Sequence, residues 1–175
     1  MTIAIYPGSF DPIHYGHIEI VRRASLIFEQ VIWAAYDRPL KNVLFNEQER
    51  LDFMREAALD LPKVTVQSYH GLTVLFARQV GAKAIVRGLR ATHDFEIEYQ
   101  MALTNAQQAS EIETVCLMTG AQYAFLSSSI LKEVALANGD ISSMVPPYVA
   151  SRLQTRIAQL GEDRGEKVKL VSLQE

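Results

Sequence analysis

Two histidines and a glycine near the N-terminus have the types and spacing needed to hold a phosphate. His14, Gly16 and His17 close the stretch YPGSFDPIHYGH at 6–17, which follows an apolar run and leads into a helical pattern. Free backbone amides at a helix N-terminus attract anions, histidines can donate to phosphoryl oxygens, and a glycine lets the backbone approach a ligand. We expect His17 to stabilise charge developing on a phosphate, with Ser9 orienting the reacting groups. For so short a motif, a turn whose histidines only cap a helix is the alternative.

Two arginines form a second candidate anion site. Arg87 and Arg90 flank a glycine and a leucine in the sequence RGLR at 87–90, directly after an apolar run. Guanidinium groups offer several planar donors to phosphate oxygens, and Gly88 removes side-chain obstruction. A solvated turn with two surface arginines is the competing interpretation.

Three consecutive serines, at 127–129, stand directly before another helical pattern. One hydroxyl can cap that helix, and the amides of its first turn can receive a phosphate. Plain capping is the alternative, although three serines exceed what a cap needs. A serine nucleophile is not expected, because no base neighbours the run and no G-x-S-x-G elbow is present.

The remaining charged candidates are weaker from the residues alone. Lys41 would by itself be taken as a solvated lysine, and most of the acidic run at 94–98 as a solvated helix face, with one carboxylate able to bind ribose hydroxyls. His70 and His93 lack ligand-like spacing, so no metal site is predicted in the protein.

Alternating apolar runs and helical patterns predict the elements that position these residues. The capping pattern of Asn46 with Glu49, a left-handed Gly139 and a helix start at 146–147 mark three helix ends. Strands are expected at 2–6, 30–36, 64–69, 84–87 and 114–119, and helices at 17–28, 46–60, 72–80, 93–109, 128–138 and 146 to about 160. This order predicts an α/β protein with a Rossmann-like doubly wound five-stranded parallel sheet and helices on both faces. The loops after the first, second, fourth and fifth strands should share one cleft.

Length and composition favour one soluble domain. The 175 residues predict a single domain at 1–160, followed by a charged tail at 161–175. The net charge of −3 argues against a general nucleic-acid-binding surface, and no apolar run or leader pattern predicts a membrane segment or a signal peptide. The one cysteine, Cys116, lies in an apolar run, so we expect it to be buried and inert in a reducing cytoplasm.

Taken together, the motifs resemble those of bacterial phosphopantetheine adenylyltransferases, within the nucleotidyltransferase superfamily. The resemblance covers about residues 2–160 and is carried by YPGSFDPIHYGH at 6–17, IVRGLRATHDFEIE at 85–98 and FLSSSILKEVA at 125–135. It implies transfer of AMP from ATP, with Mg²⁺, to 4′-phosphopantetheine, giving dephospho-coenzyme A and pyrophosphate. It also implies a homohexamer and feedback binding of coenzyme A.

The resemblance further implies residue roles. His17, Lys41 and Arg90 would act in the reaction itself, by stabilising the transition state and offsetting the charge of two polyanions. The acceptor would be bound by Ser9, Lys41, Thr73 and Arg87. ATP would be bound by Ser9, Phe10, His17, Gly88, Leu89, Arg90, Glu98, Tyr123, Ala124, Phe125, Leu126, Ser127, Ser128 and Ser129.

Three rival functions can be compared with this one. Another nucleotidyltransferase could act on nicotinamide mononucleotide or on a cytidylyl acceptor. A nucleotide-binding sensor would bind ATP without turnover. A class I aminoacyl-tRNA synthetase would need a KMSKS-like loop and a tRNA-binding domain, and this sequence has neither.

Overall fold

Five parallel strands form the centre of the molecule, in the spatial order β3-β2-β1-β4-β5. The computed structural model describes residues 2–39, 43–90 and 92–164. The strands are β1 (Ile3–Gly8), β2 (Gln30–Tyr36), β3 (Val64–Tyr69), β4 (Ala84–Leu89) and β5 (Glu113–Met118). The helices are α1 (Tyr15–Ile27), α2 (Glu47–Ala57), α3 (Thr73–Gln79), α4 (Thr92–Gln108), α5 (Ser128–Leu136) and α6 (Pro147–Arg164), with a 3₁₀ turn η1 (Ala121–Tyr123). The predicted doubly wound α/β fold is confirmed.

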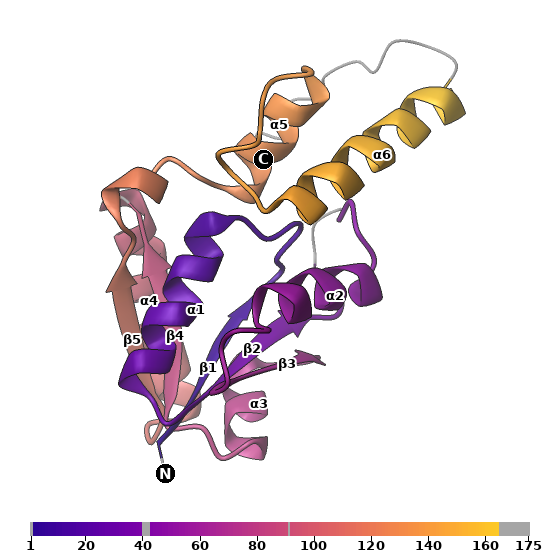
Figure 1. Cartoon of the computed structure of the whole chain (residues 1–175). Coiled ribbons are helices and arrows are strands. Elements are labelled where there is room, and N and C mark those ends of the chain that lie inside the picture. The colour runs from indigo at the N-terminus through magenta and orange to yellow at the C-terminus, as the bar shows by residue number, and fades with distance from the viewer. Residues whose placement is uncertain (1, 40–42, 91, 165–175) are drawn as a thin grey trace.

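Helices cover both faces of the sheet, as Figure 1 shows. Alternate residues of each strand point to opposite faces, so the sheet supplies two hydrophobic clusters. Trp33 and Val86 belong to the cluster that includes residues of α1 and α2, whereas Ile5 and Ile85 belong to the one that includes residues of α3. Helices α5 and α6 lie beyond the carboxyl ends of the strands (Figure 1), where they close the top of the first cluster through Leu131 and Leu153.

Local sequence signals account for the helix ends, with one correction. The Asn46 side chain accepts from the Glu49 amide while the Glu49 carboxylate accepts from the Asn46 amide, which confirms the predicted capping box. At the end of α5 the left-handed residue is Asn138, with φ of 58°, and not Gly139 as predicted. The Gly139 amide instead donates to Val134 O at 2.8 Å, and a Cβ at Gly139 would lie 2.6 Å from the Val134 side chain. Glycine is therefore needed there for close approach.

The prediction for Cys116 is wrong, because this cysteine is exposed. Strand β5 is an edge strand, paired with β4 alone in the part of the chain that the structure describes. Its residues Val115 and Leu117 face the cluster on the α1 side. Cys116 and Met118 alternate to the other face, which α4 leaves largely uncovered, and Met118 is 64% exposed.

Two boundaries differ from the prediction, and the first of them concerns the site. Strand β4 continues to Leu89 and not to 87 as expected, so Arg87 and Gly88 belong to the strand and are held by its pairing with β5. Helix α6 continues to Arg164, and the rest of the expected tail, 165–175, lies outside the described residues. Within the described ranges, no helix combines the length and hydropathy that crossing a bilayer requires.

Candidate functional site

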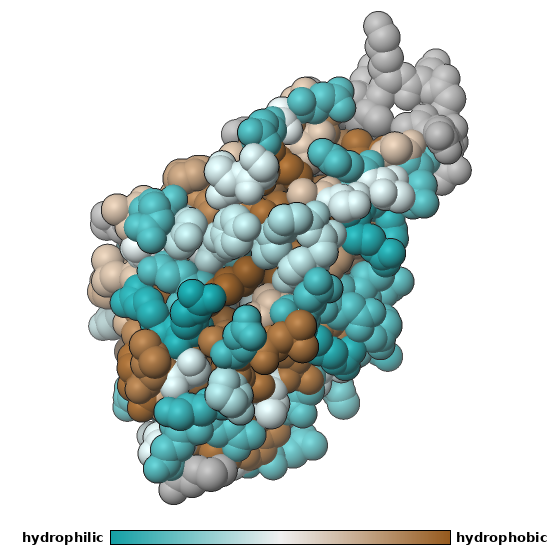
Figure 2. Space-filling view, viewed as in Figure 1, coloured by the Kyte–Doolittle hydropathy of each residue, from teal (hydrophilic) through white to brown (hydrophobic). Residues whose placement is uncertain are grey.

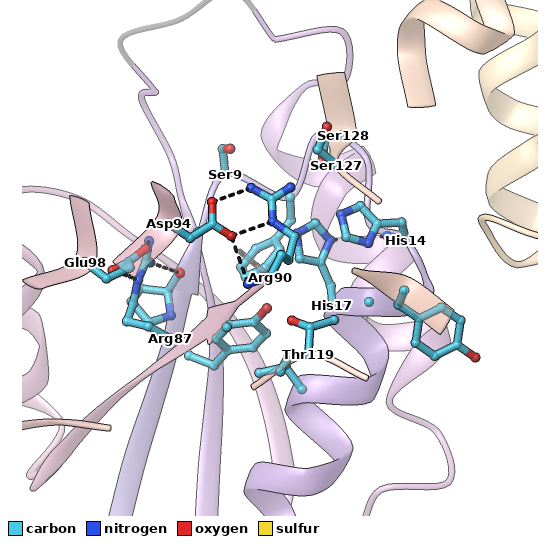
Figure 3. A pocket seen from close by; sticks show the side chains of 18 of the residues that line it. Ser9, His14, His17, Arg87, Arg90, Asp94, Glu98, Thr119, Ser127 and Ser128 are labelled. Atoms are coloured by element: carbon cyan, nitrogen blue, oxygen red, sulfur yellow. Dashed lines mark hydrogen bonds and ion pairs between the residues drawn. The ribbon is translucent and has the colours of Figure 1, made fainter. Parts of the chain in front are cut away.

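A cavity of about 340 Å³ opens where β1, β4 and β5 end, at the edge of the sheet that the topology favours for ligands. Figure 3 shows side chains of β4 and α4 on one side of it, and His14 and His17, at the start of α1, on the other. Most of the predicted site residues line this cavity: Ser9, Phe10, His17, Arg87, Gly88, Arg90, Glu98, Tyr123, Ser127, Ser128 and Ser129. Three of the four loops expected to share a cleft therefore do so; the loop after β2 contributes no described lining residue.

The loop after β1 turns sharply at Phe10, which has a φ of 50°. A bulky residue in this left-handed region is strained, and the strain must be offset by its surroundings. The Phe10 ring is only 3% exposed, and it meets the rings of Tyr6, Trp33 and His17 edge-on at 5.3, 5.6 and 5.1 Å. The turn thus places the buried Phe10 ring against the His17 ring and limits the positions that His17 can take.

The backbone fixes which nitrogen of His17 carries the proton. His14 is the extended N-cap residue of α1, and its backbone N–H donates to His17 Nδ1 at 3.2 Å. Because Nδ1 accepts this bond, the ring proton sits on Nε2, and His17 can donate from that atom into the cavity it lines. The two imidazoles stack with ring centres 3.6 Å apart, and a Cβ at Gly16 would come within 3.1 Å of the His14 ring. Glycine here preserves the stack.

His14 itself is a neutral support. Its side chain is buried, and burial together with the nearby positive charge of Arg90 lowers its pKa from 6.5 to about 3. If His14 were protonated, its charge would lie against the His17 ring. The neutral form of His14 avoids this charge, so the two imidazoles can stay stacked.

Arg87 is anchored at the bottom of the cavity by a two-point ion pair. Its Nε and Nη2 atoms donate to the two Glu98 oxygens at 2.6 and 2.5 Å, and Nη1 donates to Pro7 O at 2.9 Å. Burial opposes the guanidinium charge, but the Glu98 carboxylate outweighs it and the pKa of Arg87 is raised. The planar fork geometry holds this cation in one orientation.

Arg90 bridges three segments. Its Nε and Nη2 donate to Asp94 at 2.8 and 2.9 Å, and its Nη1 donates to Leu126 O at 2.8 Å. The guanidinium therefore connects the end of β4, the first turn of α4 and the stretch before α5. Asp94 and Glu98 are four residues apart on α4 and both line the cavity, whereas Glu96 is exposed, so the acidic run is solvated only in part.

The consecutive serines at 127–129 make different contacts. Ser127 is the N-cap of α5, and its Oγ accepts from the Ile130 amide at 3.1 Å. The Ser128 hydroxyl donates to Pro12 O at 2.9 Å, which ties α5 to the loop after β1. Capping alone therefore does not account for the run, and the first turn of α5 faces the cavity.

Some predicted residues do not line the cavity. Leu89 and Leu126 are buried, while Ala124 and the largely exposed Phe125 lie in the connection beside it. Thr73 begins α3, where its hydroxyl lies 3.1 Å from the Tyr69 hydroxyl. Lys41 lies outside the described residues.

Sequence reasoning missed several residues that hold this site together. Asp94 could have been found, since it lies one helical turn before Glu98. Asp11 and Arg50 are each 1% exposed, and Arg50 donates to Ser9 O at 2.7 Å and Tyr36 O at 2.8 Å. Arg50 thereby joins the ends of β1 and β2. No local pattern identifies it, because its acceptors are backbone carbonyls of distant residues.

The chain is similar to known proteins over most of its length. Residues 5–134 match the family model described as cytidylyltransferase-like. The chain is 50% identical to the phosphopantetheine adenylyltransferase of Desulforudis audaxviator, over 93% of this chain and 99% of that one. It is 52% identical to the same enzyme of Chloroflexus aggregans, over 92% and 100% of the two chains. A solved structure described as a candidate nicotinate-nucleotide adenylyltransferase of Vibrio parahaemolyticus superposes with a TM-score of 0.65 at 16% identity, covering 87% of this chain and 99% of that chain, which supports the fold alone.

The buried neutral histidine predicts an acid-sensitive fold. Burial lowers the pKa of His14 to about 3 in the folded chain, from an ordinary 6.5. The unfolded chain therefore binds the extra proton between these values, and His14 lowers the free energy of unfolding as pH drops below 6.5. His14 contributes about 1.4 kcal/mol of this loss per pH unit. Urea unfolding from pH 7 to 4.5, at fixed protein concentration, should show a shallower pH dependence for His14→Gln than for the unaltered chain. Parallel profiles would contradict the assignment.

Proposed function

Because the chain belongs to the phosphopantetheine adenylyltransferase family, we propose that it transfers the adenylyl group of ATP to 4′-phosphopantetheine. The products are dephospho-coenzyme A and pyrophosphate, in the penultimate step of coenzyme A biosynthesis. The observation that carries the proposal is identity of about 50% over nine-tenths of the chain. The cavity supports it, since it combines a histidine donor, two arginines and a helix N-terminus.

The chemistry is an in-line displacement at the α-phosphorus. An oxygen of the acceptor phosphate forms the new bond to this phosphorus while the bond to the bridging oxygen of pyrophosphate breaks. The attacking oxygen is already ionised at neutral pH, so the protein has little proton transfer to perform. Its task is to bring two polyanions together in line and to stabilise the charge of the transition state. No covalent enzyme intermediate is needed.

The residue roles that we propose combine position in the cavity with the pattern of the family. His17 donates from Nε2 to the α-phosphoryl group, and Arg90 and the amides at the start of α5 offset the triphosphate charge. Ser9 and Arg87 meet the acceptor, as do Lys41 and Thr73 in the family pattern. Glu98 meets the nucleotide, and the remaining nucleotide contacts are those of the same pattern: Phe10, Gly88, Leu89, Tyr123, Ala124, Phe125, Leu126, Ser127, Ser128 and Ser129.

Magnesium enters with the nucleotide. Mg²⁺ bound with ATP would offset charge on the departing pyrophosphate. Among the described residues no group of three or more His, Cys, Asp or Glu side chains is arranged to hold a metal ion. Asp94 and Glu98, the two carboxylates of the cavity wall, are engaged with Arg90 and Arg87. We therefore assign the ion to the substrate.

Helix α4 supplies the contact between copies of the chain. Its large apolar side chains are about half exposed: Phe95, Ile97, Tyr99, Met101 and Leu103. Met118 of β5 is 64% exposed as well. Phe95, Tyr99 and Leu103 follow one side of the helix and Ile97 and Met101 another, so the apolar surface extends around α4. We call these six residues the α4 face. Exposed apolar surface of this extent supports an interaction site. Figure 2 shows a different side of the molecule, the one covered by α1 and α2, where hydrophobic side chains reach the surface in groups between hydrophilic ones. A cytoplasmic homohexamer that binds coenzyme A as a feedback inhibitor is the form we propose.

Acceptor-dependent release of pyrophosphate tests the proposed function. With ATP and Mg²⁺, the protein should release pyrophosphate when 4′-phosphopantetheine is added, with dephospho-coenzyme A identified by mass. Nicotinamide mononucleotide, and CTP in place of ATP, serve as comparison substrates. Turnover with one of these alone would assign the chain to another nucleotidyltransferase. ATP binding without any turnover would identify a sensor.

Replacement of His17 should mainly affect the chemical step. We expect His17→Ala to lower kcat by roughly 100-fold or more with a smaller change in KM, because the bond from Nε2 strengthens only as charge develops. Steady-state kinetics of protein with an unchanged thermal midpoint measures this. His70→Ala is the matched control, since His70 is exposed at the end of β3, and its kcat should remain unaltered. A kcat near that of the unaltered protein for His17→Ala would refute the role.

A charge placed on the α4 face should disrupt assembly. Met101→Glu puts a carboxylate among apolar side chains that are covered only when copies associate, so sedimentation should shift toward smaller species. Leu59→Glu is the matched control, because Leu59 is also an exposed apolar residue, at 79%, but lies just beyond α2. Equal sedimentation of all three proteins would place the interface elsewhere.

A further inference from the structure

A buried carboxylate lies behind the wall of the cavity. Asp11 is 1% exposed, and its carboxylate accepts from three donors at close range. The Leu44 amide lies 3.0 and 2.9 Å from its two oxygens, the Phe45 amide lies 2.8 Å from Oδ1, and Lys132 Nζ lies 2.9 Å from Oδ2. The carboxylate is therefore fully engaged within the protein.

These contacts join three segments that are far apart in the sequence. Asp11 belongs to the loop at 9–14, which runs from Ser9 to the N-cap His14 just before His17 and which we call the histidine loop. The amides belong to the segment that leads into α2, and Lys132 belongs to α5. Two of these segments line the cavity directly. One side chain thus sets the positions of the histidine loop and of the helix N-terminus relative to each other.

Helix α5 is attached to the histidine loop along one face. Ser128 and Lys132 are four residues apart, so they lie on the same side of the helix. Ser128 donates to Pro12 O while Lys132 reaches the neighbouring Asp11. The Lys132 side chain is only 12% exposed, so its ammonium group depends on Asp11 for compensation.

Stability alone does not explain such a pair. Taking two charges out of water offsets most of their attraction, and well-packed apolar residues of similar volume often stabilise a fold as well or better. A buried ion pair does fix geometry, because both groups must meet at one distance. Neither Asp11 nor Lys132 is among the residues that line the cavity, so any effect on the reaction acts through the segments they hold.

We propose that Asp11 and Lys132 are a positioning pair for adenylyl transfer, holding the amides of α5 in register with His17 across the nucleotide phosphates. The inference rests on the proposed function, since it concerns the same cavity. A displacement of about 1 Å between groups that must act together can cost up to about 100-fold in rate.

The test is the kinetics of Lys132→Met, which keeps chain length but removes the charge. We expect kcat to fall roughly 10-fold or more, with the dissociation constant for ATP changed less than about threefold, because alignment and not binding is lost. Lys132→Arg retains a cation and should recover kcat to within about threefold. Should Lys132→Met fail to fold, Lys132→Gln takes its place.

Arg156→Met is the matched control for general loss of packing. Arg156 also carries a charge from a late helix to the same segment, and its hydrogen bonds go to Leu44 O at 2.9 Å and to Glu49, not to α5 or the histidine loop. It should lower the thermal midpoint as much as Lys132→Met while kcat stays within twofold. The double variant Asp11→Asn with Lys132→Met should lose no more activity than the worse single variant.

The outcomes separate this inference from the proposed function. If the unaltered chain releases no pyrophosphate with the acceptor, the proposed function fails first. If it does, and folded Lys132→Met or Lys132→Gln keeps kcat within twofold, the positioning pair is refuted. An equal fall in kcat for Arg156→Met would also refute it, because the effect would then follow stability alone.

Discussion

The parallel pairing of β1 with a strand on each side is the constraint from which the site follows. Because β1 pairs with β2 over six residues and with β4 on its other side, the carboxyl ends of the central strands meet at one edge. The chain must then return across the sheet after each strand, and every return begins at that edge. Arg50 reinforces the arrangement by binding the carbonyls that end β1 and β2 with one guanidinium.

At this edge of the sheet, the cavity is lined by arginines that are paired with carboxylates, and by a histidine and a tyrosine that stay neutral. Arg87 and Arg90 are each fixed by an acidic residue of α4 before any ligand arrives. His14 is kept neutral, and burial raises the pKa of Tyr6 well above its ordinary range. A polyanion entering this space meets donors whose orientation is already set, so little reorganisation accompanies the reaction.

The sequence predicted what depends on local order. Strand and helix alternation predicted the sheet, and the motifs around His17, Arg87 and Ser128 lie where the strand ends bring them together. What it could not predict depends on partners distant in the chain: Asp11 meets a lysine 121 residues away. Asn138 takes the left-handed position because its neighbour must approach Val134 closely, which is a packing requirement that helix-end patterns do not contain.

The exposed Cys116 gives the chain a practical property. It is the one thiol among 175 residues, and on β5 it stands in register with Arg87 of the neighbouring strand. In the dissociated chain, a fluorescent or spin label attached by ordinary thiol chemistry would therefore sit at a single known position, one strand away from an arginine of the cavity and two residues from Met118 of the α4 face. The protein carries a spectroscopic attachment point beside its site without any engineered residue.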